Sequence, residues 1–334
     1  MKQLRQEPVL DVKNLNVYFK TRFSRLDAVK GLDFHVNKGE VLGIVGESGC
    51  GKSVTSLAVM GLLEAPGGYQ ADEILFEGQD ISQISKEERR RLRGGKMAMI
   101  FQEPLTSLNP LLTVGNQLYE QVKTHTPGIS KTECRQRCIE MLRKTGIPDP
   151  ESTYRNYPAF LSGGMRQRVM IAIALACNPA LLIADEPTTA LDVTIQAQIL
   201  SLMKKLQKES ETAIMFITHD LGVIAEMADR VMVMYAGQAV EVADVMTLFH
   251  APAHPYTKGL LSSTVKVHEL SDRLETIDGV VPTLNNMPEG CRFAPRCPYA
   301  KSVCQTAIPG LRPADGHPEH LTRCILSGGD GIGE

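Results

Sequence analysis

Short apolar runs, each closed by glycine or by a polar turn, recur along this chain and predict buried strands. The clearest runs are Val41–Val45, Met97–Phe101, Leu181–Ala184, Ala213–Ile217 and Val231–Tyr235. Compact runs bounded by turn residues are typical of strands buried on both faces. Further short strands are expected near the N-terminus, at Val9–Asp11, Leu15–Phe19 and Ala28–Val36.

Segments with helical periodicity lie between these runs. One begins at Lys52, and residues 111–160 are expected to be mostly helical with a break at Gly146–Pro150. Strands that alternate with helices indicate a parallel sheet. The pattern therefore predicts an α/β fold.

The bulk composition permits a large core and excludes some partners. The chain has 334 residues, of which 43% are hydrophobic, so one large domain plus an appendage is expected. The formal net charge of −2 gives no overall field that attracts nucleic acid or an anionic membrane. Tryptophan is absent and aromatic residues make up 5%, so a surface for stacking bases is not expected.

The two ends of the chain also differ in character. Residues Met1–Glu7 lack the apolar run of a signal peptide, and the sequence has no run of about 18 apolar residues, so we expect a cytosolic chain. Beyond about His250 proline becomes frequent, which predicts a main domain over residues 1–250 and a turn-rich extension over residues 251–334. The glycine-rich segment Ser327–Glu334 is expected to be disordered.

A glycine-rich segment after the first buried run fits the phosphate-binding pattern G-x-x-x-x-G-K-[ST]. Its residues are Gly46, Glu47, Ser48, Gly49, Cys50, Gly51, Lys52 and Ser53. Glycines let backbone N–H groups converge on phosphate oxygens, and the helix that follows directs its positive end at them. Lys52 is expected to bridge the β- and γ-phosphates of a bound nucleotide, and Ser53 to ligate Mg²⁺. The alternative is a chance glycine turn, which the flanking strand and helix argue against.

Two carboxylates, Asp185 and Glu186, close the buried run Leu181–Ala184. Asp185 is expected to orient Mg²⁺, and Glu186 to polarise the water that attacks the γ-phosphate. An isolated pair of carboxylates after a strand is often a solvated turn, but the phosphate loop upstream favours the catalytic interpretation. Together the two segments predict an enzyme that hydrolyses a nucleoside triphosphate.

The segment just upstream of these carboxylates resembles the signature of ATP-binding cassette (ABC) ATPases. It keeps Ser162, Gly163 and Gly164, but has Met165 where the family usually has glutamine. In that family the signature contacts the γ-phosphate bound to the other subunit. The resemblance therefore implies two ATPase domains that face each other head to tail, each completing the other's nucleotide site.

Other elements of the ABC family follow in sequence order. Gln102 resembles the Q-loop glutamine, which implies contact with Mg²⁺ and the attacking water, and Ala190–Asp192 resembles the D-loop at the dimer interface. His219 resembles the switch histidine that senses the γ-phosphate. Phe19 matches the position of the aromatic residue that stacks on adenine, with Tyr18 as the alternative. The resemblance implies a P-loop NTPase of ABC ATPase type with a helical subdomain at about residues 103–165.

Four cysteines stand apart in the C-terminal extension. Cys291, Cys297, Cys304 and Cys324 are separated by five, six and nineteen residues. Disulfides are not expected in a reducing cytosol. Wide spacing favours a [4Fe–4S] cluster as a structural staple over zinc, which usually shows C-x-x-C pairs, and a site without metal is the remaining alternative. The spacing also resembles the cysteine pattern in the tails of some peptide-importer ATPases.

The extension carries a further resemblance, to the oligopeptide/dipeptide (peptide/nickel) importer subfamily. The matching segments are Ala251–Leu261 with its His-Pro-Tyr block, Gly279–Pro282, Gly290–Pro298 and, upstream, Glu103–Pro110. The nearest likeness is to the first ATPase subunits of bacterial dipeptide permeases. It implies an ATPase that powers import of dipeptides or short peptides across the bacterial inner membrane, with nickel, glutathione or antimicrobial peptides as alternative cargo.

The same resemblance implies a set of partners. They are a second homologous ABC ATPase in a heterodimer, two transmembrane permease subunits and an external peptide-binding protein, with this chain peripheral on the cytoplasmic face of the membrane. A soluble ABC protein that acts on nucleic acid or ribosomes is the alternative from another class. Such proteins usually carry two cassettes or a long coiled-coil insertion, and this chain has neither. The extension could also be a packing element only.

Overall fold

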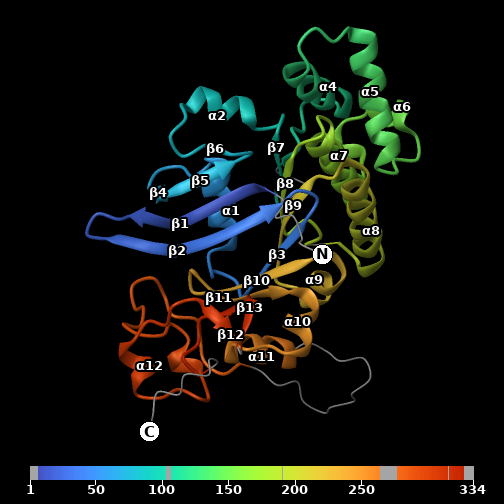
Figure 1. The fold of residues 1–334 in the computed structure, drawn as a ribbon. Helices are drawn as coiled ribbons and strands as arrows, with labels where there is room; N and C mark the ends of the chain where they lie inside the picture. The colour runs from blue at the N-terminus through green and yellow to red at the C-terminus, as the bar shows by residue number, and fades with distance from the viewer. Residues whose placement is uncertain (1–6, 103–106, 190, 264–276, 315, 327–334) are drawn as a thin grey trace. The chain divides into compact units, whose positions relative to one another are not determined.

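The structure is a computed structural model that describes residues 7–102, 107–189, 191–263, 277–314 and 316–326 (Figure 1). It divides into two compact units. The first comprises Met1–Leu10, His35–Val41 and Leu75–Ile217, and the second comprises Asp11–Phe34, Leu42–Ile74 and Thr218–Glu334. Each unit is described separately, and an element that crosses a boundary is given with the unit that holds most of it.

The first unit is built on a parallel three-strand segment of sheet. The strands β7 (Met97–Ile100) and β9 (Ala213–Thr218) flank β8 (Leu181–Asp185), and β8 is buried at every position. Leu181 lies opposite both Met97 and Ala213, so the three apolar runs are in register. Two short strands precede them, β5 (Glu73–Phe76) and β6 (Gln79–Asp80), which pair with each other.

Helices make up the rest of the first unit. They are α2 (Lys86–Leu92), α4 (Val114–His125), α5 (Lys131–Lys144), α6 (Pro150–Arg155), η1 (Pro158–Phe160), α7 (Gly163–Leu175) and α8 (Val193–Ser210). Side-chain caps define where most of them begin, because an oxygen at the N-cap accepts a first-turn N–H group that would otherwise be unpaired. The capping residues are Ser85, Thr113, Ser130, Asp149, Ser162 and Asp192. Helices α4, α5 and α6 pack on one another, as Figure 1 shows in green.

The second unit contains the rest of the strands. β10 (Arg230–Tyr235) pairs in parallel with β3 (Val41–Val45) and antiparallel with β11 (Gln238–Asp244). From the C-terminal extension, β13 (His317–Thr322) pairs with β11, and β12 (Arg312–Ala314) pairs with β13. β1 (Pro8–Lys20) neighbours β2 (Arg25–Asn37) and pairs with β4 (Gly67–Gln70).

The helices of the second unit are short. They are α1 (Lys52–Met60), α9 (Leu221–Met227), α10 (Val245–His250), α11 (Pro255–Ser262), η2 (Ala294–Arg296) and α12 (Val303–Thr306). Within the described residues of both units, no helix has the length and apolarity that a membrane span requires.

A buried carboxylate organises the start of the C-terminal extension. Glu241, on β11, has no exposed surface. Its two oxygens accept the backbone N–H groups of Ala253 and His254 at 2.7 and 2.8 Å, and His320 Nε2 on β13 lies 2.7 Å from Oε1. A buried carboxylate is tolerated when its oxygens are satisfied in this way. Glu241 therefore joins the start of α11 to the tail strand β13.

Most predicted elements are observed, with two differences. The strands expected at Val9–Asp11 and Leu15–Phe19 are one continuous strand, β1. The polar residues Lys13 and Asn14 between them are exposed to solvent, and Asn14 has a left-handed φ of 50° without ending the strand. The helical region at 111–160 has the predicted break before Pro150 and a second break between α4 and α5. Residues 103–106, Ala190 and the tail 327–334 lie outside the described residues.

Candidate functional site

The phosphate-binding segment forms a tight loop between β3 and α1. A Cβ added at Gly46 would lie 2.1 Å from the carbonyl oxygen of Met234. Gly51 has a φ of 103°, and a Cβ added there would lie only 2.9 Å from Cγ2 of Val29. Both positions therefore require glycine. Gly51 is the N-cap of α1 and has no side-chain cap, so first-turn N–H groups of the helix are directed at the loop.

Lys52 lies inside this loop. Its side chain is buried, and Nζ donates to the carbonyl oxygens of Gly46 at 2.7 Å and Glu47 at 3.1 Å. Ser48 and Gly49 are exposed at the tip. The loop thus combines a fixed ammonium group, accessible backbone and a helix N-terminus, which is an arrangement that can hold the phosphates of a nucleotide.

The two predicted carboxylates lie at the end of β8 in the first unit. Asp185 is buried, and Glu186 has a left-handed φ of 48° with its N–H bonded to the carbonyl of Ile217 at 2.9 Å. Glu186 Oε2 accepts hydrogen bonds from Gln102 Nε2 and Thr189 Oγ1, each at 3.0 Å. Non-glycine residues in this backbone region cluster at functional sites. The structure therefore places the predicted residue Gln102 in hydrogen-bond contact with Glu186, and shows a second contact from Thr189.

Thr189 was not among the residues expected from the sequence. The signal that could have found it is the hydroxyl-bearing pair after Glu186-Pro187, since threonine close to a catalytic carboxylate can hydrogen-bond to it.

The signature segment forms the start of α7. Ser162 is its N-cap, and Ser162 Oγ accepts the N–H of Met165 at 3.3 Å, so the residue that departs from the family pattern contributes through its backbone. Ser162 and Gly163 are exposed. A Cβ on Gly164 would lie 2.9 Å from Cγ2 of Ile195, so glycine permits the close approach of α8.

The remaining predicted site residues lie in both units. Asp192 caps α8 through the N–H of Ile195 at 2.9 Å, and His219 is exposed directly after β9. Phe19 lies opposite Gly67 in the pairing of β1 with β4. The alternative aromatic residue, Tyr18, has the guanidinium of Arg25 over its ring at 3.9 Å.

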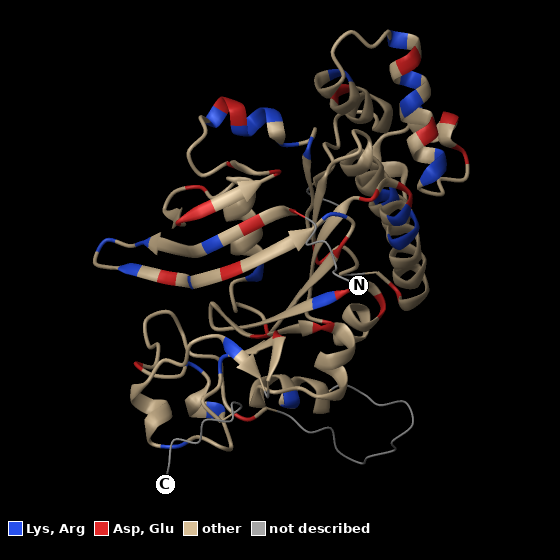
Figure 2. Ribbon diagram, in the orientation of Figure 1, with Lys and Arg blue, Asp and Glu red and all other residues tan. Residues whose placement is uncertain are grey.

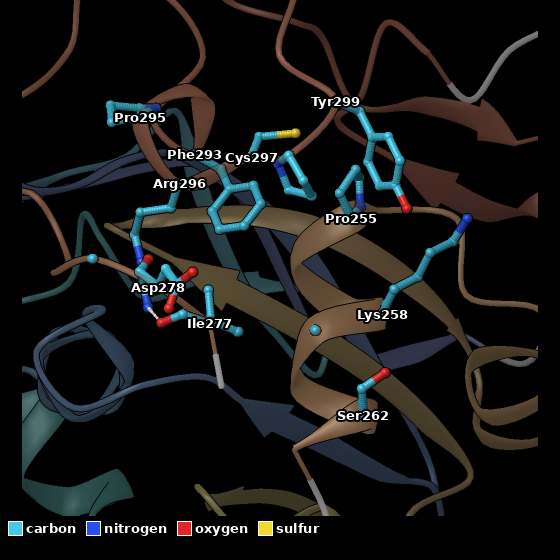
Figure 3. A pocket seen from close by; sticks show the side chains of 13 residues that line it. Pro255, Lys258, Ser262, Ile277, Asp278, Phe293, Pro295, Arg296, Cys297 and Tyr299 are labelled. Atoms are coloured by element: carbon cyan, nitrogen blue, oxygen red, sulfur yellow. Dashed lines mark hydrogen bonds between the residues drawn. The ribbon is translucent and has the colours of Figure 1, made fainter. Parts of the chain in front are cut away.

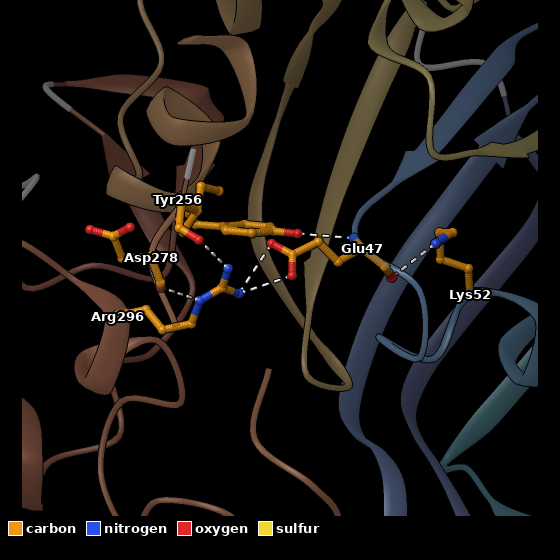
Figure 4. A network of polar contacts seen from close by, with 6 residues as sticks. Glu47, Lys52, Tyr256, Asp278 and Arg296 are labelled. Atoms are coloured by element: carbon orange, nitrogen blue, oxygen red, sulfur yellow. Dashed lines mark hydrogen bonds and ion pairs between the residues drawn. The ribbon is translucent and has the colours of Figure 1, made fainter. Parts of the chain in front are cut away.

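The C-terminal extension touches the phosphate loop at Glu47, which sequence analysis did not anticipate (Figure 4). The N–H of Glu47 donates to the hydroxyl oxygen of Tyr256 at 3.0 Å. Arg296 Nη1 lies 2.9 and 3.1 Å from the two carboxylate oxygens. The available signal was an acidic residue within a loop that the sequence predicts to bind phosphates.

An open cavity of about 530 Å³ is lined by Arg296 and by residues of α11 (Figure 3). Lys258, Ser262, Asp278 and Tyr299 contribute polar groups to its lining. Cys297 also lines it, and is the one predicted cluster cysteine that does so.

The predicted iron–sulfur cluster is not supported, and this prediction is wrong. Cys291, Cys297, Cys304 and Cys324 all line one cavity, but its volume is about 10 Å³, roughly the space of a single water molecule. Across the described ranges no group of three or more His, Cys, Asp or Glu side chains could hold a metal ion. This finding also removes the zinc alternative.

Two of the four thiols lie in surroundings that favour the neutral form. Burial raises the pKa of Cys291 and of Cys297, which favours the neutral thiol over the thiolate that binds metals. The sulfurs of Cys304 and Cys324 accept backbone N–H groups from Lys301 at 3.5 Å and Leu326 at 3.4 Å. The four cysteines are free and pack the interior of the extension.

Comparison with protein families and relatives agrees with this geometry. The chain matches the family described as ABC transporter over residues 29–189, and the oligopeptide/dipeptide transporter C-terminal region over residues 240–304. It is 54% identical to the oligopeptide transport ATP-binding protein AppD of Bacillus subtilis over 304 residues, which are 91% of this chain and 92% of that protein. It is 52% identical to the dipeptide transport ATP-binding protein DppD of Escherichia coli over 309 residues, 92% and 94% of the two chains.

Solved structures show the same fold. The ATP-binding cassette MJ0796, in a dimeric post-hydrolysis state bound to ADP and Pi, matches with a TM-score of 0.63 and 28% identity, over 71% of this chain and 98% of that one. The cassette cbiO1 of Clostridium perfringens matches with a TM-score of 0.62 and 28% identity, over 74% and 92%. With an ABC match, a C-terminal region of the oligopeptide/dipeptide type and relatives above 50% identity, the chain belongs to the ATP-binding proteins of the ABC transporter family.

Proposed function

We propose that this chain is the ATP-hydrolysing subunit of an importer for dipeptides or other short peptides in the bacterial inner membrane. One observation carries the proposal: the similarity to oligopeptide and dipeptide transport ATP-binding proteins covers more than 90% of this chain, and so includes the C-terminal region as well as the ATPase region. We also propose that residues 1–250 are the ATPase domain and residues 251–334 an extension characteristic of peptide importers.

The roles of the nucleotide-binding residues follow from their chemistry and from the family resemblance. The loop Gly46–Ser53 holds the phosphates through its backbone N–H groups and Lys52, and Phe19 stacks on adenine. Ser162, Gly163 and Gly164 serve the nucleotide of the partner ATPase. Ser162 and Gly163 are exposed at a helix N-terminus, which supports this role.

The donor set fits Mg²⁺. Ser53, Gln102 and Asp185 offer hydroxyl, amide and carboxylate oxygens, the hard ligands that this ion prefers. We assign the ion to these three residues together with ATP. Bound there, Mg²⁺ would neutralise charge on the phosphate oxygens.

Glu186 is the proposed general base. Its Oε2 atom accepts hydrogen bonds from Gln102 and Thr189, so two neighbours restrict the orientation of the carboxylate that would accept a proton from water. His219 is the proposed sensor of the γ-phosphate. ATP then favours a closed pair of ATPase domains, and hydrolysis removes that preference, so the energy is coupled through differential affinity for the closed state.

The proposed assembly has several chains. A second, homologous ABC ATPase completes the nucleotide sites, two permease subunits form the path, and an external binding protein selects the peptide, with this chain on the cytoplasmic face of the membrane. The dimeric cassette structures that match this chain support the paired arrangement.

The first test is isolation of the tagged chain from its own host in mild detergent, followed by mass spectrometry. We expect two polytopic membrane proteins and a second ABC ATPase. Ribosomal proteins or nucleic acid without any membrane protein would overturn the proposal.

Peptide uptake by cells tests the chemistry. Glu186→Gln should abolish uptake, while the same substitution at the exposed Glu209 on α8 should leave it unchanged. Uptake that survives Glu186→Gln would contradict the role of the base.

The alternative of a soluble ABC protein on nucleic acid receives no support from the charge distribution. On α2 and α5, where Lys and Arg are frequent, Asp and Glu are interspersed with them (Figure 2). Surfaces of mixed sign do not concentrate phosphate backbones.

A further inference from the structure

Glu47 places a negative charge in a loop that is proposed to hold a triphosphate. A free carboxylate there would repel the phosphates. The main chain of the same residue is engaged on both sides, because its carbonyl accepts Lys52 Nζ at 3.1 Å and its N–H donates to Tyr256 at 3.0 Å. The charge and position of Glu47 therefore affect both the conformation of the loop and the position of Lys52.

Arg296 neutralises this carboxylate from a fixed position. Nη1 contacts both oxygens of Glu47, while Nε donates to the carbonyl of Asp278 at 2.9 Å and Nη2 to that of Ile277 at 3.0 Å. The arginine side chain is only 6% exposed, against 28% for Glu47. Because all three nitrogens have partners, the guanidinium cannot turn away from Glu47 without losing bonds to two carbonyl groups.

Tyr256 is held equally firmly. It is fully buried, with its ring 4.7 Å from Tyr235 and 5.4 Å from Phe293 between centroids. Burial raises its pKa, so the hydroxyl is neutral and can accept the N–H of Glu47. Tyr235 ends β10, next to Met234, whose carbonyl lies against Gly46. The aromatic group therefore fixes the extension against the base of the phosphate loop.

We propose that Arg296 and Tyr256 are positioning residues of the nucleotide site, through which the C-terminal extension sets the affinity for ATP. Arg296 cancels the charge of Glu47 and holds it away from the phosphates, and Tyr256 fixes the backbone of the loop. The inference rests on the proposed function, since it concerns ATP bound at Gly46–Ser53. It makes the extension a part of the ATP site and not only a packing element.

The test is the dissociation constant of a fluorescent ATP analogue for the full chain. Arg296→Gln should weaken binding about five- to tenfold, because Glu47 is left charged beside the loop. Adding Glu47→Gln should restore affinity to within about twofold of wild type, since the repulsion is removed. The deficit of Arg296→Gln should also shrink in high salt, which screens the repulsion.

Arg323→Gln is the matched control. Arg323 also lies in the extension and binds carbonyl groups, those of Ala239 and Pro309, but the structure gives it no bond to the loop among the described residues. It should leave ATP affinity unchanged. If Arg296→Gln and Arg323→Gln lower the melting temperature alike and both keep wild-type affinity, the extension is a structural staple and the inference is overturned.

Two further variants separate the possible failures. Tyr256→Phe keeps the ring packing and removes only the acceptor of the Glu47 N–H, so binding should weaken about threefold. Unchanged affinity in this variant would count against the inference even if Arg296→Gln did not fold. If wild type binds the analogue no better than Lys52→Ala, the proposed function and this inference both fail, whereas normal wild-type binding with no effect of Arg296→Gln overturns the inference alone.

Discussion

Replacing Glu241 with alanine removes the acceptor for two backbone N–H groups and the side-chain partner of His320. The backbone N–H groups of Ala253 and His254 lose partners at 2.7 and 2.8 Å, and His320 loses its contact at 2.7 Å. Hydrogen bonds to charged groups contribute about 1.5–3 kcal/mol each. Because the contacts are not additive, we expect the free energy of unfolding to fall by about 3–5 kcal/mol.

Urea denaturation at neutral pH measures this loss. Glu241→Gln should lose roughly half as much, because the amide oxygen keeps one acceptor while its NH₂ faces a donor. Glu319→Ala is the matched control, since Glu319 is an exposed neighbour of His320 on β13, and it should change stability by less than about 0.5 kcal/mol. A loss of less than about 1 kcal/mol in the free energy of unfolding for Glu241→Ala would refute the reasoning, because the groups that contact Glu241 would then have found other partners.

Three other predictions follow from single contacts. Burial lowers the pKa of His254 to about 3, so below about pH 6.5 the unfolded state binds a proton that the folded state excludes. The free energy of unfolding should therefore fall by about 1.4 kcal/mol for each unit by which the pH is lowered from about 6.5 to about 3, as measured by urea denaturation. Gly164→Ala places a methyl group against Ile195 and should destabilise the protein by about 1–3 kcal/mol in the same assay. Thr189→Val removes one of the hydrogen bonds that orient Glu186, so the ATPase kcat of the assembled complex should fall about five- to tenfold.

Each of these has a control within the chain. His254→Asn keeps a capping side chain at the start of α11 without the titration, so the acid slope should become shallower; an unchanged slope would show that other groups carry it. Gly163→Ala meets only Leu191 Cδ2 at 3.9 Å and should be nearly neutral for stability. If Thr189→Val retains full kcat, Gln102 alone suffices to orient the carboxylate.

The local structure of the proposed nucleotide site could be predicted, whereas its links to the extension could not. The strand, loop and helix around Gly46–Ser53 and the carboxylates after β8 are encoded by short segments, in which glycine, lysine and acidic residues have few structural explanations. Glu47 contacts Tyr256, which is 209 positions further along the chain, and Arg296, which is 249 positions further. The pattern of hydrophobic and polar residues does not predict contacts between residues so far apart in sequence.

The four cysteines of the extension are the case in which the sequence led to a wrong prediction, that of an iron–sulfur cluster. All four cysteines line one cavity, but their spacing does not encode how much room lies between the thiols or which backbone groups their sulfurs accept. A metal site depends on those quantities.

The strands β12 and β13 of the C-terminal extension lie on the side of β11 that faces away from β10. An open strand would present unpaired N–H and C=O groups to any other chain in a crowded cell. Here β13 pairs with β11 at Glu241 and Val242, and among the described residues the edge strand of this sheet is β12, which has three residues with Pro313 at its centre, opposite Leu321. A short strand that carries proline is a poor template for further pairing. A chain cut after His250 would therefore lose its protection against strand-to-strand aggregation together with its extension.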